Sequence, residues 1–331
     1  MKHPGRTIWV LAVLLLLVMF FSLFLGRYPT PFWLSPLQIA TDPLAAALVW
    51  DFRLPRILLA VLLGAALSTA GFAMQMVFRN PLVEPGFLGV SQGAAFGSAL
   101  TIVAFGGSLA LAEGLAALFA ILGLLLSYLF ARAIRYGGWV LRLVLAGIAV
   151  SALFAAGVGM LKFVADPLRQ LPEIVFWLLG GLSGARWEQV WYVLPFALIG
   201  LLVLFLLRWR LNLLSLDDAT AFSLGIHPGR ERWLVLLAAV LPVAALVSVS
   251  GIVGWVGLIV PHFSRRLVGA NARWALPVAM LLGAIFVLLC DDLARTVLAG
   301  EIPLGILTSL VGALLFLWLF VRFTPRERKA A

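Results

Sequence analysis

The apolar sequence GAALSTAGFAMQMVFRNPLVEPGFLGVSQGA, residues 64–94, contains one polar interruption, in which Arg79, Pro81, Glu84 and Pro85 separate two hydrophobic runs. Proline lacks a backbone donor and disfavours helix in the residue before it. The pattern therefore predicts a turn that keeps two long helices from fusing into one. Arg79 and Glu84 are close enough in this turn to pair.

The composition indicates a membrane protein. Apolar residues make up 63% of the 331 positions and charged residues 11%, whereas soluble domains average roughly 45–50% and about 25%. The excess forms runs of 17 to 24 residues, long enough as helices to cross ~30 Å of hydrocarbon. The first run follows Lys2 and Arg6 but is too long for a signal-peptide core and lacks a small-x-small cleavage site, so it is expected to remain as a span.

The runs predict an all-α polytopic protein with about ten transmembrane helices in one domain, residues 1–331. External segments 27–53 and 163–189 are expected to carry short interfacial helices, and segment 208–232 is expected to be cytoplasmic. The expected spans are 8–26, 54–77, 87–107, 109–131, 140–162, 190–207, 233–250, 252–268, 274–293 and 303–321.

Charge predicts the orientation. An even number of spans places both termini on one side, and with the N-terminus inside, 17 of the 24 Arg and Lys residues fall in cytoplasmic segments and seven outside. This bias follows the positive-inside rule. We expect both termini in the cytoplasm and the chain in the inner membrane. The net charge of +10 records topology rather than nucleic-acid binding.

Motifs for catalysis and for energy supply are missing from the sequence. It has no G-x-x-x-x-G-K-[ST], H-E-x-x-H or G-x-S-x-G motif, and Cys290 is its single cysteine. We therefore expect no catalytic residues, no resident cofactor and no metal site. The spans hold few ionisable groups, whereas an ion-coupled secondary carrier needs them. A membrane enzyme would need a polar cluster, and the nearest one is Asp291, Asp292, Arg295 and Glu301, interpreted more simply as an outer docking rim.

Glycines recur at helical spacing, as in Gly89, Gly93 and Gly97 and again in Gly251, Gly254 and Gly257. Such spacing lets helices approach closely. We interpret these residues as packing positions and assign no pore residue from them.

Seven motifs, in order along nearly the whole chain, resemble the FecCD-type permease subunits of bacterial ABC importers, with their type II fold. They are RLPR (53–56), the sequence 64–94 quoted above, LAGIAVSA (145–152), FWLLGGLSG (176–184), NLLSLDDATAFSLGI (212–226), GIVGWVGLIVPHFSRRLVG (251–269) and DDLARTVLAGEIPLGILTSLVGALLFLWLF (291–320).

The resemblance implies a transport subunit rather than an enzyme. Two copies would form a central pathway, two ATPase subunits holding ATP and Mg would dock on the cytoplasmic face, and a substrate-binding protein would dock outside. It favours an iron–siderophore complex as substrate, with cobalamin, haem, and molybdate or tungstate as alternatives. A neutral pathway suits a large chelate better than a small oxyanion.

Family positions carry over to the polar turn as a cytoplasmic gate. Asn80 and Leu82 match the residues beside the pathway in the family. A second gate element corresponds to the turn before the fifth span, around Trp139 and Val140. Irregular backbone at such a place is tolerated where it lines a cavity rather than lipid.

The inner segment 212–226 matches the two short coupling helices that, in the family, sit in a groove on the ATPase. Its apolar positions suit an interface with a polar rim, and an aspartate can cap a helix N-terminus. An amphipathic helix resting on lipid headgroups is the alternative. The coupling residues are Leu213, Leu214, Leu216, Asp217, Asp218, Phe222, Leu224 and Gly225.

Three external arginines, Arg53, Arg56 and Arg295, match those that contact acidic residues of the binding protein in the family. The planar guanidinium suits bidentate pairing with a carboxylate. Interfacial anchoring, or pairing with Asp51 and Asp292, is the alternative.

Overall fold

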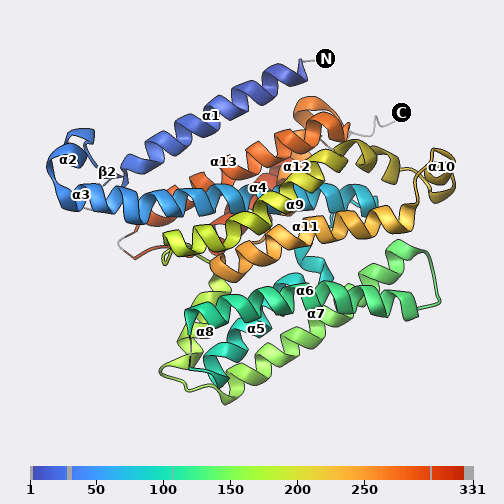
Figure 1. The fold of residues 1–331 in the computed structure, drawn as a ribbon, viewed down its shortest axis with the longest axis horizontal. Coiled ribbons are helices and arrows are strands. Elements are labelled where there is room, and N and C mark those ends of the chain that lie inside the picture. Colours follow the sequence, from blue (N-terminus) through green and yellow to red (C-terminus); the bar gives the residue numbers. More distant parts are fainter. Residues whose placement is uncertain (1–2, 28–31, 107, 299, 324–331) are drawn as a thin grey trace, which may run out of the picture.

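The computed structural model describes residues 3–27, 32–106, 108–298 and 300–323, and most of them are helical (Figure 1). Lys2, Arg326, Arg328 and Lys329, which entered the charge count, lie outside these ranges. The elements are α1 (Pro4–Phe24), β1 (Leu25–Gly26), β2 (Phe32–Trp33), α2 (Pro36–Thr41), α3 (Pro43–Ala47), the π-helix η1 (Leu48–Arg53), α4 (Leu54–Phe78), the 3-10 helix η2 (Pro85–Leu88), α5 (Val90–Ala104), α6 (Leu109–Ala133), α7 (Trp139–Val164), α8 (Gln170–Leu179), α9 (Trp187–Leu214), α10 (Asp218–Ser223), α11 (Pro228–Ser250), α12 (Val256–Val268), α13 (Ala272–Thr296) and α14 (Leu304–Phe323).

Seven helical segments of the described chain are long and apolar enough to cross a membrane: α1, the α3–α4 segment, α6, α7, α9, α11 and α13. The three other expected spans coincide with α5, α12 and α14. The length and composition of these three helices do not confirm that they cross the membrane. The expected span 252–268 differs most. Its helix, α12, begins only at Val256. Residues 251–255 are not helical, and Trp255, the residue before the helix, takes a left-handed backbone with φ of 69°.

The prolines of the polar turn act as expected. Helix α4 ends at Phe78, and no helix resumes until Pro85 begins η2. Proline also starts helices elsewhere, in the first turns of α1, α4 and α11, where the missing N–H has no intrahelical partner to lose. The two external segments expected to hold short helices contain α2, α3, η1 and α8.

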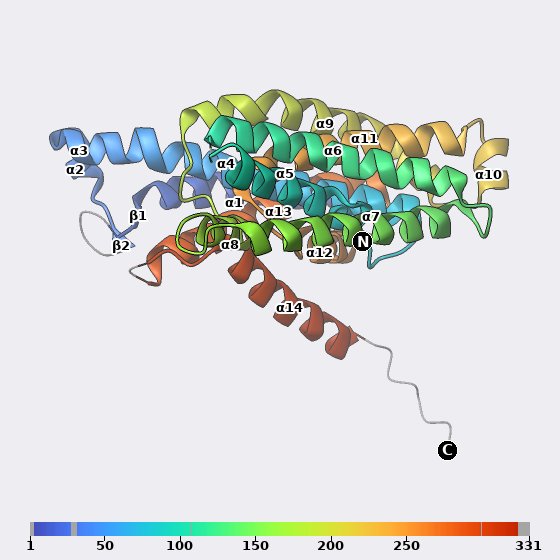
Figure 2. The same ribbon diagram turned by 90° about the horizontal axis from the view of Figure 1, so that it is seen from below.

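Helix α4 forms the centre of the bundle. It packs against α13, α11, α12 and α9 and is buried along most of its length, whereas little of α1 is buried. Helices α5, α6 and α7 pack together as a second group, joined to the first through α6 and α11 (Figure 1). Helix α14 leaves the bundle at an angle, and its outer face has no neighbour among the described residues (Figure 2).

The glycine spacing marks close helix contacts, as expected. A Cβ at Gly93 or Gly97 of α5 would lie 2.2 or 2.3 Å from a carbonyl oxygen of α6, and a Cβ at Gly64 of α4 would lie 2.1 Å from the Gly283 oxygen of α13. Only glycine lets these backbones approach so closely. A Cβ added at Gly254 would have no heavy atom within 4 Å.

Replacing Gly64 by alanine is expected to lower the melting temperature of the permease in detergent. The added Cβ meets backbone, which cannot move aside, and overpacking of this kind costs about 1–3 kcal/mol. Gly254→Ala is the matched control and should melt like the wild type. Equal melting temperatures for both variants would contradict the close α4–α13 contact.

Candidate functional site

The turn that follows α4, called the gate turn (residues 79–84), has a defined backbone and an exposed surface. Arg79 ends α4 in the left-handed conformation, with φ of 51° and ψ of 31°. The Asn80 carboxamide oxygen then accepts a hydrogen bond from the Leu82 N–H at 2.9 Å, which forms an Asx turn. The Leu82 side chain is 48% exposed. The predicted gate residues therefore lie at the surface of a single chain, where a second copy could meet them.

The far side of the gate turn is attached to α12. The Glu84 carboxylate accepts a hydrogen bond from the Trp255 N–H at 3.3 Å, and a ring nitrogen of His262 lies 3.1 Å from the Pro81 oxygen. Burial raises the pKa of Glu84, and the Trp255 hydrogen bond opposes this rise. The expected Arg79–Glu84 pair is not among the ion pairs of the described residues, because Arg79 points to a different carboxylate.

That carboxylate belongs to Asp218, the first residue of α10. Asp218 accepts from Arg79 Nη2 at 2.8 Å and from Arg232 Nη1 of α11 at 2.9 Å. The Arg232 side chain is 3% exposed, so its charge depends on this partner. The short helix in the predicted coupling segment is thus bonded directly to the gate turn.

The predicted second gate element joins the same assembly. Trp139 is the first residue of α7, its ring lies under the Arg232 guanidinium at 5.1 Å, and it packs against Phe78 of α4 at 5.9 Å. A cation over an indole face is attracted to it. Asp218, Arg79, Arg232 and Trp139 therefore form one continuous set of contacts, called the coupling cluster.

The coupling segment contains one short helix rather than two. Helix α9 continues to Leu214, whose side chain is fully buried in the core, and Leu213 is partly buried. The expected exposed apolar face is therefore smaller than predicted: Leu216, Phe222 and Leu224 are its exposed members. These residues remain candidates for contact with a partner.

The predicted N-cap of α10 is present, and a glycine follows the C-terminal end of the helix. The Asp217 side chain accepts from the Thr220 N–H at 2.9 Å, as expected for an N-cap aspartate. Gly225 takes a left-handed backbone after the helix, with φ of 84°, a conformation that side chains disfavour.

The attachment of α10 is expected to weaken in acid. The Arg232 hydrogen bond, assisted by Arg79, lowers the pKa of Asp218 against the opposing effect of burial. A carboxyl whose folded pKa lies below its unfolded value of about 3.9 stabilises the fold above that pH and loses this contribution as pH falls through the folded pKa. Hydrogen-exchange protection of residues 217–225, corrected for intrinsic rates, should hold from pH 7 to 5 and fall below pH 4. Protection lost by pH 6 would contradict this.

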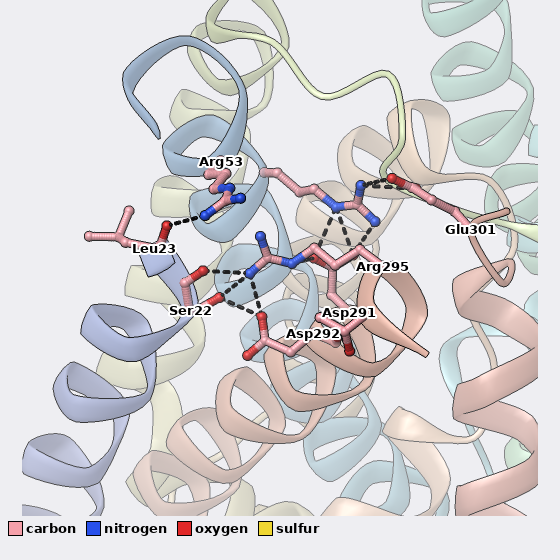
Figure 3. A network of polar contacts seen from close by, with 9 residues as sticks. Ser22, Leu23, Arg53, Asp291, Asp292, Arg295 and Glu301 are labelled. Atoms are coloured by element: carbon pink, nitrogen blue, oxygen red, sulfur yellow. Dashed lines mark hydrogen bonds and ion pairs between the residues drawn. The ribbon is translucent and has the colours of Figure 1, made fainter. Parts of the chain in front are cut away.

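A second polar cluster, drawn in Figure 3, lies at the end of the bundle opposite α10, where α4 begins (Figure 1). It is called the arginine–carboxylate cluster and comprises Ser22, Arg56, Asp291, Asp292, Arg295 and Glu301. Arg56 Nε donates to Asp291 at 3.0 Å, and its Nη1 donates to Glu301 at 2.8 Å. Arg295 Nη2 donates to the Ser22 carbonyl at 2.7 Å and pairs with Asp292. The cluster joins α1, α4, α13 and the segment before α14.

The three predicted docking arginines meet at this end, but their side chains point inward. Arg53, Arg56 and Arg295 are 6%, 8% and 8% exposed, and Arg53 donates to the Leu23 carbonyl at 2.9 Å. The pairing of Arg295 with Asp292, raised as an alternative, is present. Asp51 forms no ion pair within the described ranges. Contact with a docking protein stays a prediction.

A cavity of about 410 Å³ adjoins the arginine–carboxylate cluster, and Arg56, Glu113, Gln189 and Glu301 are among the residues that line it. Glu113, near the start of α6, accepts from Gln189 at 2.6 Å. This buried carboxylate lies at one end of the bundle, not midway along a span. No group of three or more His, Cys, Asp or Glu suited to a metal occurs among the described residues.

Sequence reasoning missed the partners of several site residues. The Asp218–Arg79 pair joins residues 139 positions apart, and the Arg295–Ser22 contact joins residues 273 apart. A local sequence pattern cannot show that residues so far apart in the sequence are in contact. A weak signal existed for Ser22, a hydroxyl in an otherwise apolar run.

The fold and the site define a class of protein. Apolar helices that can cross a membrane surround a buried central helix, and the exposed turn at the end of that helix is bonded to a short helix beyond the spans. This is the arrangement of a multi-pass membrane permease.

The model of the FecCD transport family matches residues 14–322, and the chain belongs to this family. It is therefore a transport permease subunit of the ABC importer class. The chain is 41% identical over 319 residues, 94% of each chain, to the molybdate import system permease protein of Haemophilus influenzae. It is 43% identical over 277 residues, 83% of this chain and 82% of the relative, to a probable iron chelatin transport system permease protein of Helicobacter pylori.

Two further comparisons agree. The hemin transport system permease protein of Yersinia pestis is 42% identical over 292 residues, 85% of each chain. A solved structure, described as an inward-facing conformation of a metal-chelate type ABC transporter, superposes with a TM-score of 0.89 at 42% identity and covers 96% of this chain and 99% of the other.

Proposed function

We propose that this permease imports an iron–siderophore complex in a binding-protein-dependent ABC importer. The substrate class is supported by the relatives named for iron chelatin and hemin transport. The observation that carries the mechanism is the Asp218 carboxylate, which bonds α10 to both Arg79 and Arg232. When a partner on the cytoplasmic side moves α10, these hydrogen bonds transmit the movement directly to the gate turn.

The assembly we propose has two copies of this chain, two ATPase subunits and an external binding protein. The ATPases bind ATP and Mg and dock at the α10 end, which lies in the cytoplasm with both termini. The second copy packs on the side from which α14 departs (Figure 2). Support for this arrangement comes from the exposed Phe222 and Leu224 on the coupling segment and from exposed Leu310 and Leu314 on α14.

Transport follows from alternating access. ATP binding closes the ATPase dimer and moves α10, and the coupling cluster shifts the gate turn so that Asn80 and Leu82 open or close the pathway between the two copies. The chain itself hydrolyses nothing. A switch of this kind requires an interaction whose strength differs between the two states. The ion pair between Asp218 and Arg79 is exposed enough to exchange partners.

Docking of the binding protein is assigned to Arg53 together with the arginine–carboxylate cluster. Arg53, Arg56 and Arg295 exchange their internal partners for acidic residues of the docking protein, so the cluster is both a structural brace and a docking base. Arg53→Glu is expected to weaken binding-protein docking while ATPase subunits still co-purify. Unchanged docking removes this role.

Molybdate or tungstate is the second candidate substrate, because the molybdate permease relative matches 94% of each chain. The test is uptake by proteoliposomes that contain the whole importer, supplied in turn with a ferric siderophore, haem, cobalamin and molybdate. ATP-dependent accumulation of the ferric siderophore supports the proposal. Accumulation of molybdate alone refutes the proposed substrate and leaves the importer class intact.

A further inference from the structure

A cavity of about 460 Å³ lies between the end of α9 and the start of α11, at the α10 end of the bundle. No residue of the gate turn or of the coupling cluster lines it. Its polar wall is formed by Arg210, His227, Arg230 and Glu231, and its other wall by Trp233, Leu234 and Leu237. A cavity with one charged and one apolar wall suits an amphiphile.

The charged wall carries a net positive charge. Arg210 forms an ion pair with Glu231, so these two charges cancel. Arg230 is exposed and forms no ion pair within the described part of the chain. The wall also includes the first turn of α11, whose free N–H groups carry a partial positive charge. An anion fits there.

Glu231 adds a second requirement. Its Oε2 atom is buried and accepts no hydrogen bond from the described residues. A buried acceptor without a partner is costly. A ligand that fits the cavity therefore brings a hydrogen-bond donor beside its negative charge.

The apolar wall extends away from the charges along α11. Arg230, Leu234 and Leu237 are spaced i, i+4 and i+7 and so share one helix face. Leu234 and Leu237 are 44% and 39% exposed. Leu206 and Leu202, one and two turns before Arg210 on α9, are 66% and 57% exposed. The neighbouring Trp233 packs on Tyr128 of α6 with ring centroids 4.2 Å apart, which holds the wall in place.

We infer that this cavity binds an anionic phospholipid with a hydroxylated headgroup, such as phosphatidylglycerol. Arg230 and the α11 N-terminus bind the phosphate, a glycerol hydroxyl donates to Glu231 Oε2, and one acyl chain lies along Leu234 and Leu237. Basic pockets of this kind between transmembrane helices bind lipid headgroups. A free anion would leave the leucines uncovered.

The test is native mass spectrometry of the full-length, delipidated permease titrated with phosphatidylglycerol, phosphatidylcholine or inorganic phosphate. We expect phosphatidylglycerol to bind more tightly than phosphatidylcholine and to resist displacement by millimolar phosphate. Arg230→Gln should weaken phosphatidylglycerol about fivefold, which corresponds to ~1 kcal/mol per arginine near a lipid surface. Leu237→Asn should also weaken it.

Arg135→Gln is the matched control, because it removes an exposed arginine from the loop after α6 at the same end of the bundle. It should leave lipid affinity unchanged. Equal affinity for both lipids, displacement by phosphate, or equal effects of the two arginine variants would overturn the inference. So would an Arg230→Gln variant that keeps its lipid but loses the ATPase subunits, because the surface would then belong to that partner.

Discussion

Asp218→Asn is expected to reduce ATP-driven uptake about tenfold, within the 5–150-fold range of a coupling energy of 1–3 kcal/mol, while ATPase subunits remain bound. The substitution removes the acceptor charge for Arg79 and Arg232. The Arg79 pair is exposed, and such pairs contribute little to stability. Arg232 is buried, and losing its partner leaves an uncompensated charge. The measurement is uptake by the whole importer in proteoliposomes.

A neighbouring substitution controls for the loss of a charge. Asp217→Asn removes the same charge one residue earlier, but asparagine caps a helix as well as aspartate does, so uptake should stay close to the wild type. The double variant Arg79→Gln, Asp218→Asn should lose no more ATP-driven uptake than Asp218→Asn alone. The effects of two substitutions that remove the same interaction do not add. Equal losses for Asp217→Asn and Asp218→Asn, or fully additive losses in the double variant, contradict the coupling cluster.

Arg56→Gln is expected to lower the free energy of unfolding by about 3–5 kcal/mol, the cost of breaking a buried ion pair. Asp291, its bidentate partner, has a fully buried side chain. That carboxylate keeps only a distant contact with Arg295 Nε at 3.8 Å. Thermal unfolding of the purified permease in detergent measures the loss.

Glu301→Gln is the control for this loss. The Glu301 side chain is 43% exposed, and an exposed partner typically contributes about 0–1 kcal/mol. A small decrease is therefore expected. If Arg56→Gln and Glu301→Gln destabilise the permease equally, the arginine–carboxylate cluster is not the brace described here.

Much of the fold could be predicted from local patterns. Each expected span coincides with a helix, because a long apolar run can satisfy its backbone in lipid only as a helix. The polar turn was predicted because Pro81 and Pro85 act on their immediate neighbours. The late start of α12 was not, because the left-handed Trp255 depends on the carboxylate of Glu84, which is 171 residues away in the sequence.

The candidate site was predicted by position but not by partner. The α10 segment and the gate turn were both expected from the resemblance, and the bond between them was not. Leu214 shows why exposure is harder still. Its place in an apolar run suggested an exposed face, but α9 continues through it and turns the side chain into the core. The arginines Arg53, Arg56 and Arg295 were expected to face outward. Arg53 and Arg56 are held inward by groups on other elements, the Leu23 carbonyl and the carboxylates of Asp291 and Glu301. Arg295 is held by Asp292 of its own helix and by Ser22 of α1.

The most direct measurement is uptake by sealed proteoliposomes that hold either this permease alone or the permease with its ATPase subunits and binding protein. The account predicts ATP-dependent accumulation above the external concentration in the complete assembly and only equilibration, or no entry, with the permease alone, even under an imposed proton or sodium gradient. Accumulation by the permease alone under such a gradient would contradict it.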